Sequence, residues 1–445
     1  MTPNTNTPST DPYKGVRDFY PEDQFVQRYL YAIMRETAES FGYEEYDASL
    51  LEPAELYEAK SSEEIVNEQT YTFTDRGERR VTLRPEMTPT VARMVAKRRK
   101  ELSMPLRWFT IANLFRYERP QKGRLREHIQ LNADLFGLSG HEADIEIIEL
   151  AAATLLNAGA TVDDFTISIS SRGLLNDLFE LYGVDAETRP ALTRLLDKKN
   201  KMDEKDFRDK ASGLLGERTD DFLATVSSAE ATAKMLGDDH KTLRELKELL
   251  TQLHDRGITN AAILPTLVRG FDYYTGMVFE VYDTDPDNNR SMFGGGRYDN
   301  LLATFGAEPT PAVGFGMGDV TLYEFLASRD LIPAYRSNAD LALCRVDDSA
   351  ARDISALADR LRGEQGLHVR VDLTGRKIGD QINNADKAAI PFVICVGPNE
   401  IKSGEYTIKQ LSTGAEKTVP EGGILDAMEE LATTDEESPE WTREA

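Results

Sequence analysis

Residues 115–130 gather the side chains with the most evident chemistry in this sequence. The stretch reads FRYERPQKGRLREHIQ and holds five cations within eleven residues: Arg116, Arg119, Lys122, Arg124 and Arg126. Arginines fixed on strands can hold phosphate oxygens in pairs, and cations on a loop can approach the phosphates of RNA. The stretch is therefore a candidate site for chemistry on phosphate-bearing substrates.

Three further stretches combine polar, aromatic and glycine residues at short spacing: TLRPEMTPTVARM at 82–94, LVRGFDYYTG at 267–276 and GGGRYDNLL at 294–302. The glycine turn is a weak signal alone, because such turns are more often architectural than ligand-binding. GFGMGD lacks the third glycine of a dinucleotide fingerprint, and no GK[ST] is present. The sequence therefore excludes a Rossmann or P-loop nucleotide site.

The elements that position these residues follow from hydrophobic periodicity. Helical spacing predicts helices over 22–41, 88–101 and 141–157, and two alternating runs around a turn predict a hairpin over 71–86. Residues 106–138 predict two long antiparallel strands, and the loop between them carries the cations.

The second half of the chain changes character three times. Residues 172–255 are charged, leucine-rich and helical by spacing, which indicates an insertion, and strand character returns over 263–283. Residues 312–326 predict a short strand with close-packing glycines that continues into a helix. ADLALCRV, HVRVDL and PFVICVG then alternate with helical segments at 350–363 and 376–388, as in a βαβ domain with a parallel or mixed sheet.

Composition restricts the class of protein. The 445 residues carry a net charge of −25, with 77 acidic against 52 basic side chains, and arginine outnumbers lysine. Such a surface suits concentrated salt, which predicts a salt-adapted source. The N-terminus is not a secretory signal, and no apolar run approaches the length of a membrane span, so we expect a cytoplasmic protein. The histidines lack ligand spacing, so we expect no metal site in the protein.

FRYERPQKGRLREHIQLNADLFG, TLRPEMTPTVARM, LVRGFDYYTG and GGGRYDNLL, in their order and spacing, resemble histidyl-tRNA synthetases, and the charge points to a salt-adapted archaeon. The resemblance runs from about Gly15 to about Val419. It implies the α+β fold of a class II synthetase: an antiparallel sheet flanked by helices, a helical insertion and a C-terminal α/β anticodon-binding domain. It also implies that a homodimer activates L-histidine with ATP and Mg²⁺ and then charges tRNA(His).

We accordingly expect a tail at 1–12, a catalytic domain at 13–171 and 263–330, a helical insertion at 172–262, an anticodon-binding domain at 338–432 and an acidic tail at 433–445.

The resemblance assigns roles at the phosphates. Arg116 would hold the α-phosphate and the substrate carboxylate, Arg124 the distal phosphates, and Arg269 the reacting phosphate. Strand-fixed guanidinium groups stabilise the charge that spreads in the transition state. The alternative for Arg116 is a strand residue paired with Glu118 or Glu127.

The resemblance also supplies the histidine pocket. Glu86, Thr88 and Gln130 would bind the ammonium group, and Asp134 and Tyr274 the imidazole, with Tyr273 and Met87 as neighbours. A pocket that hydrogen-bonds its substrate can reject analogues without an editing domain. The alternative for the two tyrosines is a strand pair with one ring in the core and one outside.

For tRNA, the resemblance implies that Arg119, Gln121 and Lys122 meet the acceptor end, although a solvated turn is the alternative. Arg376, Lys377 and Lys387 are candidates for the anticodon side. No role follows for Arg126.

The sequence departs from the family at several positions. Thr321 stands where motif 3 usually has an arginine for the γ-phosphate, Ser49 where motif 1 has a proline, and Asp134 where glutamate is commoner. The weakened motif 3 would suit a non-enzymatic relative, the histidine-sensing regulatory subunit of ATP phosphoribosyltransferase. That relative lacks an anticodon domain, so we expect the synthetase.

Overall fold

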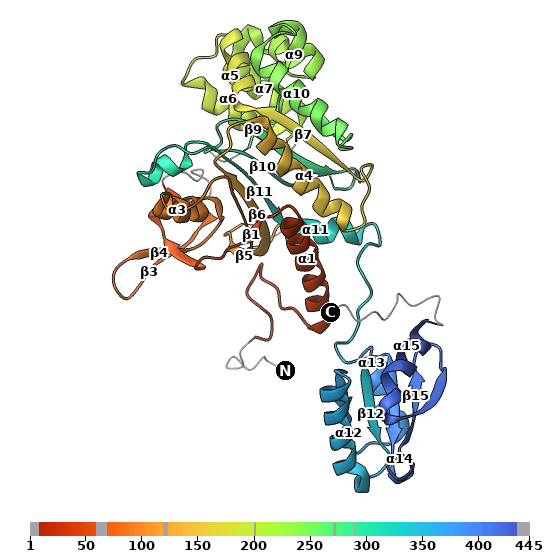
Figure 1. Cartoon of the computed structure of the whole chain (residues 1–445). Coiled ribbons are helices and arrows are strands. Elements are labelled where there is room, and N and C mark those ends of the chain that lie inside the picture. The colour runs from red at the N-terminus through yellow and green to blue at the C-terminus, as the bar shows by residue number, and fades with distance from the viewer. Residues whose placement is uncertain are drawn as a thin grey trace, which may run out of the picture. The chain divides into compact units, whose positions relative to one another are not determined.

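The structure, a computed structural model, describes residues 9–58, 69–118, 123–199, 202–269, 273–288 and 290–433 (Figure 1). The chain forms two compact units, Met1–Pro333 and Ala334–Ala445. The expected tails fall largely outside the described residues.

An eight-stranded sheet organises the first unit, in the order β1-β5-β6-β11-β10-β9-β7-β8. Its strands are β1 (Glu44–Glu45), β5 (Leu106–Phe115), β6 (Glu127–Phe136), β11 (Ala312–Gly318), β10 (Ser291–Arg297), β9 (Met277–Asp283), β7 (Phe165–Ser171) and β8 (Ala261–Ile263). The pairs are antiparallel, apart from the parallel edge pairs β1–β5 and β7–β8. The predicted strand pair of 106–138 is confirmed as β5 and β6, paired along their whole length.

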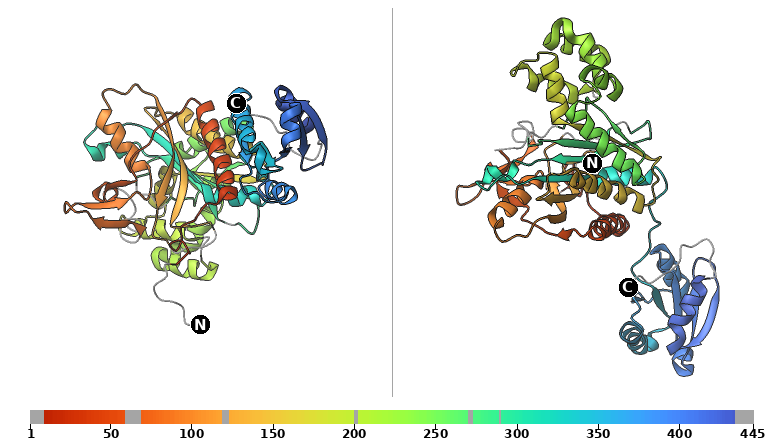
Figure 2. Two further views of the ribbon diagram at one scale, coloured as in Figure 1. Left: turned by 90° about the horizontal axis from the view of Figure 1, so that it is seen from below. Right: turned by 45° about the horizontal axis from the view of Figure 1, so that its top comes forward.

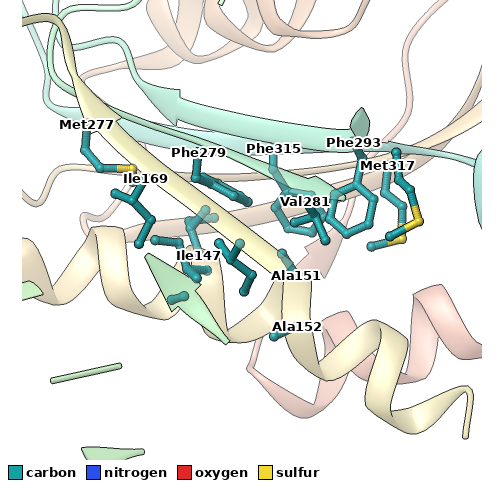
Figure 3. Close-up of a cluster of buried hydrophobic side chains, with 14 of the residues drawn as sticks. Ile147, Ala151, Ala152, Ile169, Met277, Phe279, Val281, Phe293, Phe315 and Met317 are labelled. Carbon is teal, nitrogen blue, oxygen red and sulfur yellow. The ribbon is translucent and has the colours of Figure 1, made fainter. Parts of the chain in front are cut away.

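Four helices cover one face of this sheet: α1 (Pro21–Ser40), α4 (His141–Asn157), α10 (Lys241–Asp255) and α11 (Asp319–Ala327). Figure 3 shows side chains from β7, β9, β10 and β11 packed against Ile147 and Ala151 of α4. Successive strand residues point to opposite faces, so Phe279 and Phe293 enter this core while Glu280 and Gly294 face the other side. Burial of each such phenylalanine contributes about 1.5–3 kcal/mol, which holds the opposite face in place.

A smaller layer lies beside the sheet. It contains the three-stranded sheet β2 (Leu51–Pro53), β4 (Arg80–Leu83) and β3 (Tyr71–Thr74), with the helices α2 (Glu55–Glu58) and α3 (Thr88–Arg98). The predicted hairpin of 71–86 is thus confirmed. The helix predicted from residue 88 is also confirmed, with Pro89 in its first turn, where the missing N–H costs nothing.

The helical section comprises α5 (Arg172–Leu181), α6 (Thr188–Asp197), α7 (Glu204–Leu215), α8 (Thr219–Thr225), α9 (Ala229–Leu236) and α10. Most of these helices form a cluster of their own in the right-hand view of Figure 2, whereas α10 packs against α4 and the strands β7 and β8. Leu243, Leu246, Leu249 and Leu253 of α10 are buried at the helical spacing that the sequence displays. The section ends at Asp255, because β8 already belongs to the main sheet.

The strand character predicted over 263–283 is confirmed only in part, and the predicted glycine turn is wrong. β8 ends at Ile263 and β9 begins at Met277, and Pro265 and Gly276 lie in the connection between them, where they interrupt strand pairing. The glycine run 294–296 is not a turn but the centre of β10. Its neighbours explain this, since a Cβ on Gly295 would lie 2.1 Å from the Gly314 carbonyl oxygen.

The second unit has a five-stranded sheet in the order β13-β12-β14-β15-β16. Its elements are β12 (Leu341–Arg345), α12 (Ala351–Glu364), β13 (Val369–Val371), α13 (Ile378–Lys387), β14 (Phe392–Val396), α14 (Pro398–Ser403), β15 (Glu405–Gln410), β16 (Glu416–Pro420) and α15 (Ile424–Thr433). The three predicted strands are confirmed and run parallel to one another. Antiparallel β15 and β16 complete a mixed sheet and escaped prediction.

Candidate active site

A cavity of about 2030 Å³ lies over the face of the main sheet opposite α4. Eight residues singled out in the sequence line it: Glu86, Thr88, Arg116, Arg124, Gln130, Arg269, Tyr273 and Tyr274. Sites for one small ligand commonly measure about 300–1,000 Å³, so this cavity has room for more than one substrate. The structure therefore brings together residues from three separate stretches of sequence.

Glu86 is a buried carboxylate in the wall of the cavity. It is 3% exposed, and the Tyr273 hydroxyl donates to its Oε2 at 3.0 Å. Burial, followed by the Glu86 charge, raises the pKa of Tyr273 well above its ordinary value, so the phenol stays a donor. The rings of Tyr273 and Tyr274 are 4.9 Å apart and both are buried, so the alternative of one inner and one outer ring on a strand is wrong.

Met87 does not reach the cavity. Its side chain is fully buried and packs in the cluster that contains Val91 and Leu114. Its neighbour Thr88 begins α3 and lines the cavity. The chain thus turns at this point so that Glu86 and Thr88 face the cavity while Met87 anchors them in the core.

Arg116 directly follows the last residue of β5 and is not itself a strand residue. Its Nε donates to the Pro85 carbonyl oxygen at 2.8 Å, which ties it to the Glu86 segment. Glu118 instead pairs with Arg124 at 3.3 Å, and Glu127 accepts from Asn113. Among the described residues Arg116 has no ion pair, so the alternative of a paired strand arginine fails.

Arg269 lies on the connection before β9, not on a strand. An ion pair of 2.7 Å to Glu280 fixes it, and both side chains are 15% exposed. Burial, the largest single cause, lowers the pKa of Arg269, but the charge and hydrogen bond of Glu280 and the neighbouring tyrosines together raise that pKa above its ordinary value, so the guanidinium stays charged. Gly294 makes room for it, because a Cβ there would lie 2.9 Å from Arg269 Nη1.

Gln130 and His128 project from β6 into the cavity. The Gln130 side chain leans over Gly316 of β11, the register partner of Asn132, and it fits only because that position is glycine: a Cβ at Gly316 would lie 1.7 Å from Gln130 Nε2. Burial, and then the Arg116 charge, lowers the pKa of His128 to about 3, so its imidazole is neutral. The sequence patterns assigned no role to His128.

Asp134 lies behind the cavity lining. It is 1% exposed, accepts a hydrogen bond from the Tyr298 hydroxyl at Oδ1, and has no partner for Oδ2 among the described residues. Burial raises the pKa of Asp134 to about 7, although the Tyr298 bond acts in the opposite direction. Tyr298 lines the cavity and was missed, although it follows GGGR in one of the quoted stretches.

Thr321 lies in the cavity wall, but its hydroxyl is engaged in the fold. It donates to the Met292 carbonyl oxygen at 2.9 Å and lies 3.2 Å from that of Gly318. Other cations line the same cavity and were not singled out: Arg172, Arg189, Arg194, Lys198, Lys199 and Arg290. No spacing signal marks them, because the placement of α5 and α6 beside the sheet is a tertiary property.

The remaining candidates divide into two groups. Arg119, Gln121 and Lys122 lie outside the described residues. Arg376 and Lys377 are exposed just before α13, whereas exposed Lys387 is its last residue, so the structure separates it from the other two by the length of the helix.

Within the described ranges, no cluster of three or more His, Cys, Asp or Glu side chains is arranged to hold a metal ion. The same ranges contain no helix that is long and apolar enough to span a membrane.

Comparison with known proteins supplies independent findings. A model of the histidyl-tRNA synthetase family matches residues 15–320, and one of the anticodon-binding domain matches residues 341–431. The histidine–tRNA ligase of Leptospira biflexa is 42% identical over 91% of this chain and 94% of that protein. The histidine–tRNA ligase of Haloarcula marismortui is 37% identical over 92% and 95% of the two chains.

A crystal structure of histidyl-tRNA synthetase from Nostoc sp. PCC 7120 matches with a TM-score of 0.80 at 20% identity. The match covers 96% of this chain and 100% of that one. This likeness confirms the predicted α+β fold, a central sheet flanked by helices with a C-terminal domain.

Proposed function

The chain belongs to the histidyl-tRNA synthetase family, and from this premise we propose the reaction that its cavity performs. It activates L-histidine with ATP to histidyl-adenylate and pyrophosphate, and then transfers histidine to the 3′ end of tRNA(His). The observation that carries the proposal is one cavity lined by the buried acceptor Glu86 and the cations Arg116 and Arg269, with the buried Asp134 bonded to Tyr298 of the cavity wall. ATP enters as its magnesium complex, which is substrate and not a resident cofactor.

The cations neutralise the charges that oppose adenylate formation, because a carboxylate and a polyphosphate repel each other. Arg116 holds the substrate carboxylate and the α-phosphate, and Arg269 meets the charge that spreads on the reacting phosphate. Because Glu280 and Pro85 already fix these guanidinium groups, little reorganisation is needed during reaction. Loss of one such donor commonly lowers the rate by about 10²–10³-fold.

The acceptors select histidine. Glu86, with Thr88 and Gln130, binds the ammonium group, and the open Oδ2 of Asp134 accepts an imidazole N–H. A ligand without that donor would leave a buried carboxylate unpaired, which can cost roughly 10⁴–10⁵-fold in specificity.

Arg124 and Arg290 hold the distal phosphates in place of the motif 3 arginine. Arg290 immediately precedes β10, and Thr321 donates to Met292 two residues further along. The two cations reach the cavity from different elements, which supports a divided clamp.

The exposed Arg376 and Lys377 beside α13 face the anticodon side, and Arg119, Gln121 and Lys122 the acceptor end. The cations of α5 and α6 add positive charge to the cavity wall, where RNA phosphates would bind. We further propose a cytoplasmic homodimer from a salt-adapted, archaeal source. The acidic composition supports the salt-adapted source, and the similarity to the Haloarcula ligase agrees with an archaeal one. The Leptospira ligase, a bacterial protein, has the greater identity of the two.

Histidine-dependent exchange of pyrophosphate with ATP, followed by charging of tRNA(His), tests the function in high KCl. Both reactions are expected. Histidine binding without either reaction would refute the enzyme and favour the regulatory subunit.

A further inference from the structure

Arg126 is the cation of the 115–130 stretch that the proposed chemistry does not use, yet it is the most enclosed of those described. It is 9% exposed. Its guanidinium carbon lies 4.0 Å from the ring centroid of Tyr117 and 5.5 Å from that of Tyr13. Nε donates to the Glu118 carbonyl oxygen at 3.1 Å, and Nη1 donates to the Tyr13 hydroxyl at 2.9 Å. These contacts distinguish Arg126 from an ordinary solvated surface arginine, whose guanidinium group mainly contacts water.

The backbone of Arg126 joins the same segments. The Arg116 N–H donates to its carbonyl oxygen at 2.8 Å, and its own N–H donates to the Gly15 carbonyl oxygen at 2.7 Å. Arg126 therefore bridges the end of β5, the start of β6 and residues 13–17, which we name the N-terminal strap.

A second attachment fixes the other end of the strap. Arg17 Nη2 donates to Asp319 Oδ2 at 2.6 Å, and Asp319 Oδ1 accepts from the Ile129 N–H at 3.0 Å. Asp319 is fully buried and is the first residue of α11. The strap thus connects the segment after β5, the first residues of β6 and the start of α11.

We propose that Arg126 is a positioning residue for ATP, and that the N-terminal strap acts through it. The Arg126 carbonyl oxygen accepts from the Arg116 N–H. Arg126 Nε donates to the main chain of Glu118, and the Glu118 carboxylate pairs with Arg124. These contacts of Arg126, which we name the clasp, therefore hold the two phosphate-binding arginines in position without contacting substrate. The inference rests on the proposed function.

Histidine binding should depend on the clasp much less than ATP binding does, because Arg116 is only one of several groups proposed to hold histidine. Glu86 and Asp134 take their contacts from Tyr273 and Tyr298, and neither contact involves the strap. Loss of the clasp should therefore lower kcat/KM for ATP much more than it weakens the binding of histidine.

The test compares Arg126→Ala, Arg126→Lys and Tyr13→Ala by pyrophosphate exchange and by equilibrium binding of histidine without ATP. Arg126→Ala should lower kcat/KM for ATP by about 10- to 100-fold, because small displacements of positioning groups have effects of that size. The dissociation constant of histidine should rise much less, because only the Arg116 contact with the histidine carboxylate is displaced. Arg126→Lys should remain impaired, because an ammonium group lacks the planar fork. Tyr13→Ala should show a smaller loss in the same direction.

Arg35→Ala is the matched control, since it removes an exposed, ion-paired arginine of α1 and should leave the exchange kinetics unchanged. Exchange by Arg126→Ala at the wild-type rate would overturn the inference, as would full activity of Arg126→Lys. A parallel loss of histidine binding would also overturn it and indicate a role in folding only. A wild-type protein without exchange activity would instead refute the proposed function.

Discussion

Asp134 offers the sharpest test of the histidine pocket, because its protonation should control substrate affinity near neutral pH. Its buried carboxyl has a pKa of about 7, against an ordinary value of 3.8. Only the ionised form can accept the imidazole N–H at Oδ2 while Oδ1 accepts from Tyr298. We therefore expect Asp134→Asn, which removes this titration, to change the pH dependence of histidine binding.

The size of the effect follows from the pKa. Roughly half of the Asp134 carboxyls are ionised at pH 7 and roughly a tenth at pH 6, whereas nearly all are at pH 8. The dissociation constant of histidine should thus rise about tenfold between pH 8 and pH 6 on account of this group. The imidazole of the ligand also titrates in this range, but it does so equally for the wild type and the variant.

The measurement is the ratio of the two dissociation constants, by calorimetry without ATP, from pH 6 to pH 8. The wild type should bind far better than Asp134→Asn at pH 8, and the ratio should shrink about tenfold by pH 6. A ratio that stays constant across the range would refute the reasoning, since Asp134 would then not titrate where histidine binds.

The same pKa makes a prediction for stability. A carboxyl whose pKa is raised on folding favours the folded state below pH 4, and this advantage is lost as the pH rises from about 4 to about 7. The change corresponds to at most about 4 kcal/mol. Asp134→Asn, which can still accept from Tyr298, should therefore raise the free energy of unfolding of the ligand-free protein at pH 8. Denaturant titration at pH 5 and pH 8 checks this.

Three further predictions concern the cations. Arg269→Ala should lower the pyrophosphate exchange rate by about 100-fold or more, with a much smaller effect on histidine binding, and equal losses would show that it binds histidine instead. Arg290→Ala should raise the KM for ATP several-fold and leave the dissociation constant of histidine unchanged, whereas an unaltered KM would exclude it from the phosphate clamp. Replacing Arg119 and Lys122 by alanine should reduce the slope of log charging rate against log salt by roughly 1 to 2, and an unchanged slope would indicate a solvated loop.

The elements that local pattern determines were predictable. The apolar residues of 106–138 predicted the strand pair, and the leucine spacing of 172–255 predicted a helical section, which includes α10. The glycines of 294–296 predicted a turn, because glycine usually weakens strands. They lie within β10 instead, where the close approach of neighbours such as Arg269 leaves no room for a Cβ.

Much of the site could not be predicted from the sequence, because it also depends on tertiary contacts. The resemblance supplied Asp134, but its unpaired oxygen depends on the closure of the fold around Tyr298. Likewise, the cations of α6 reach the cavity through tertiary packing, and the contacts of Arg126 join residues more than a hundred positions apart.

Strand β9 carries residues of the hydrophobic core and a residue that fixes the candidate active site. Along this strand, Phe279 and Val281 pack against α4, while the intervening Glu280 holds Arg269. A substitution that loosens the packing under α4 would tilt the strand and move Glu280 with it. Substitutions in this part of the core should therefore slow the charging of tRNA before they reduce the amount of folded protein in the cell.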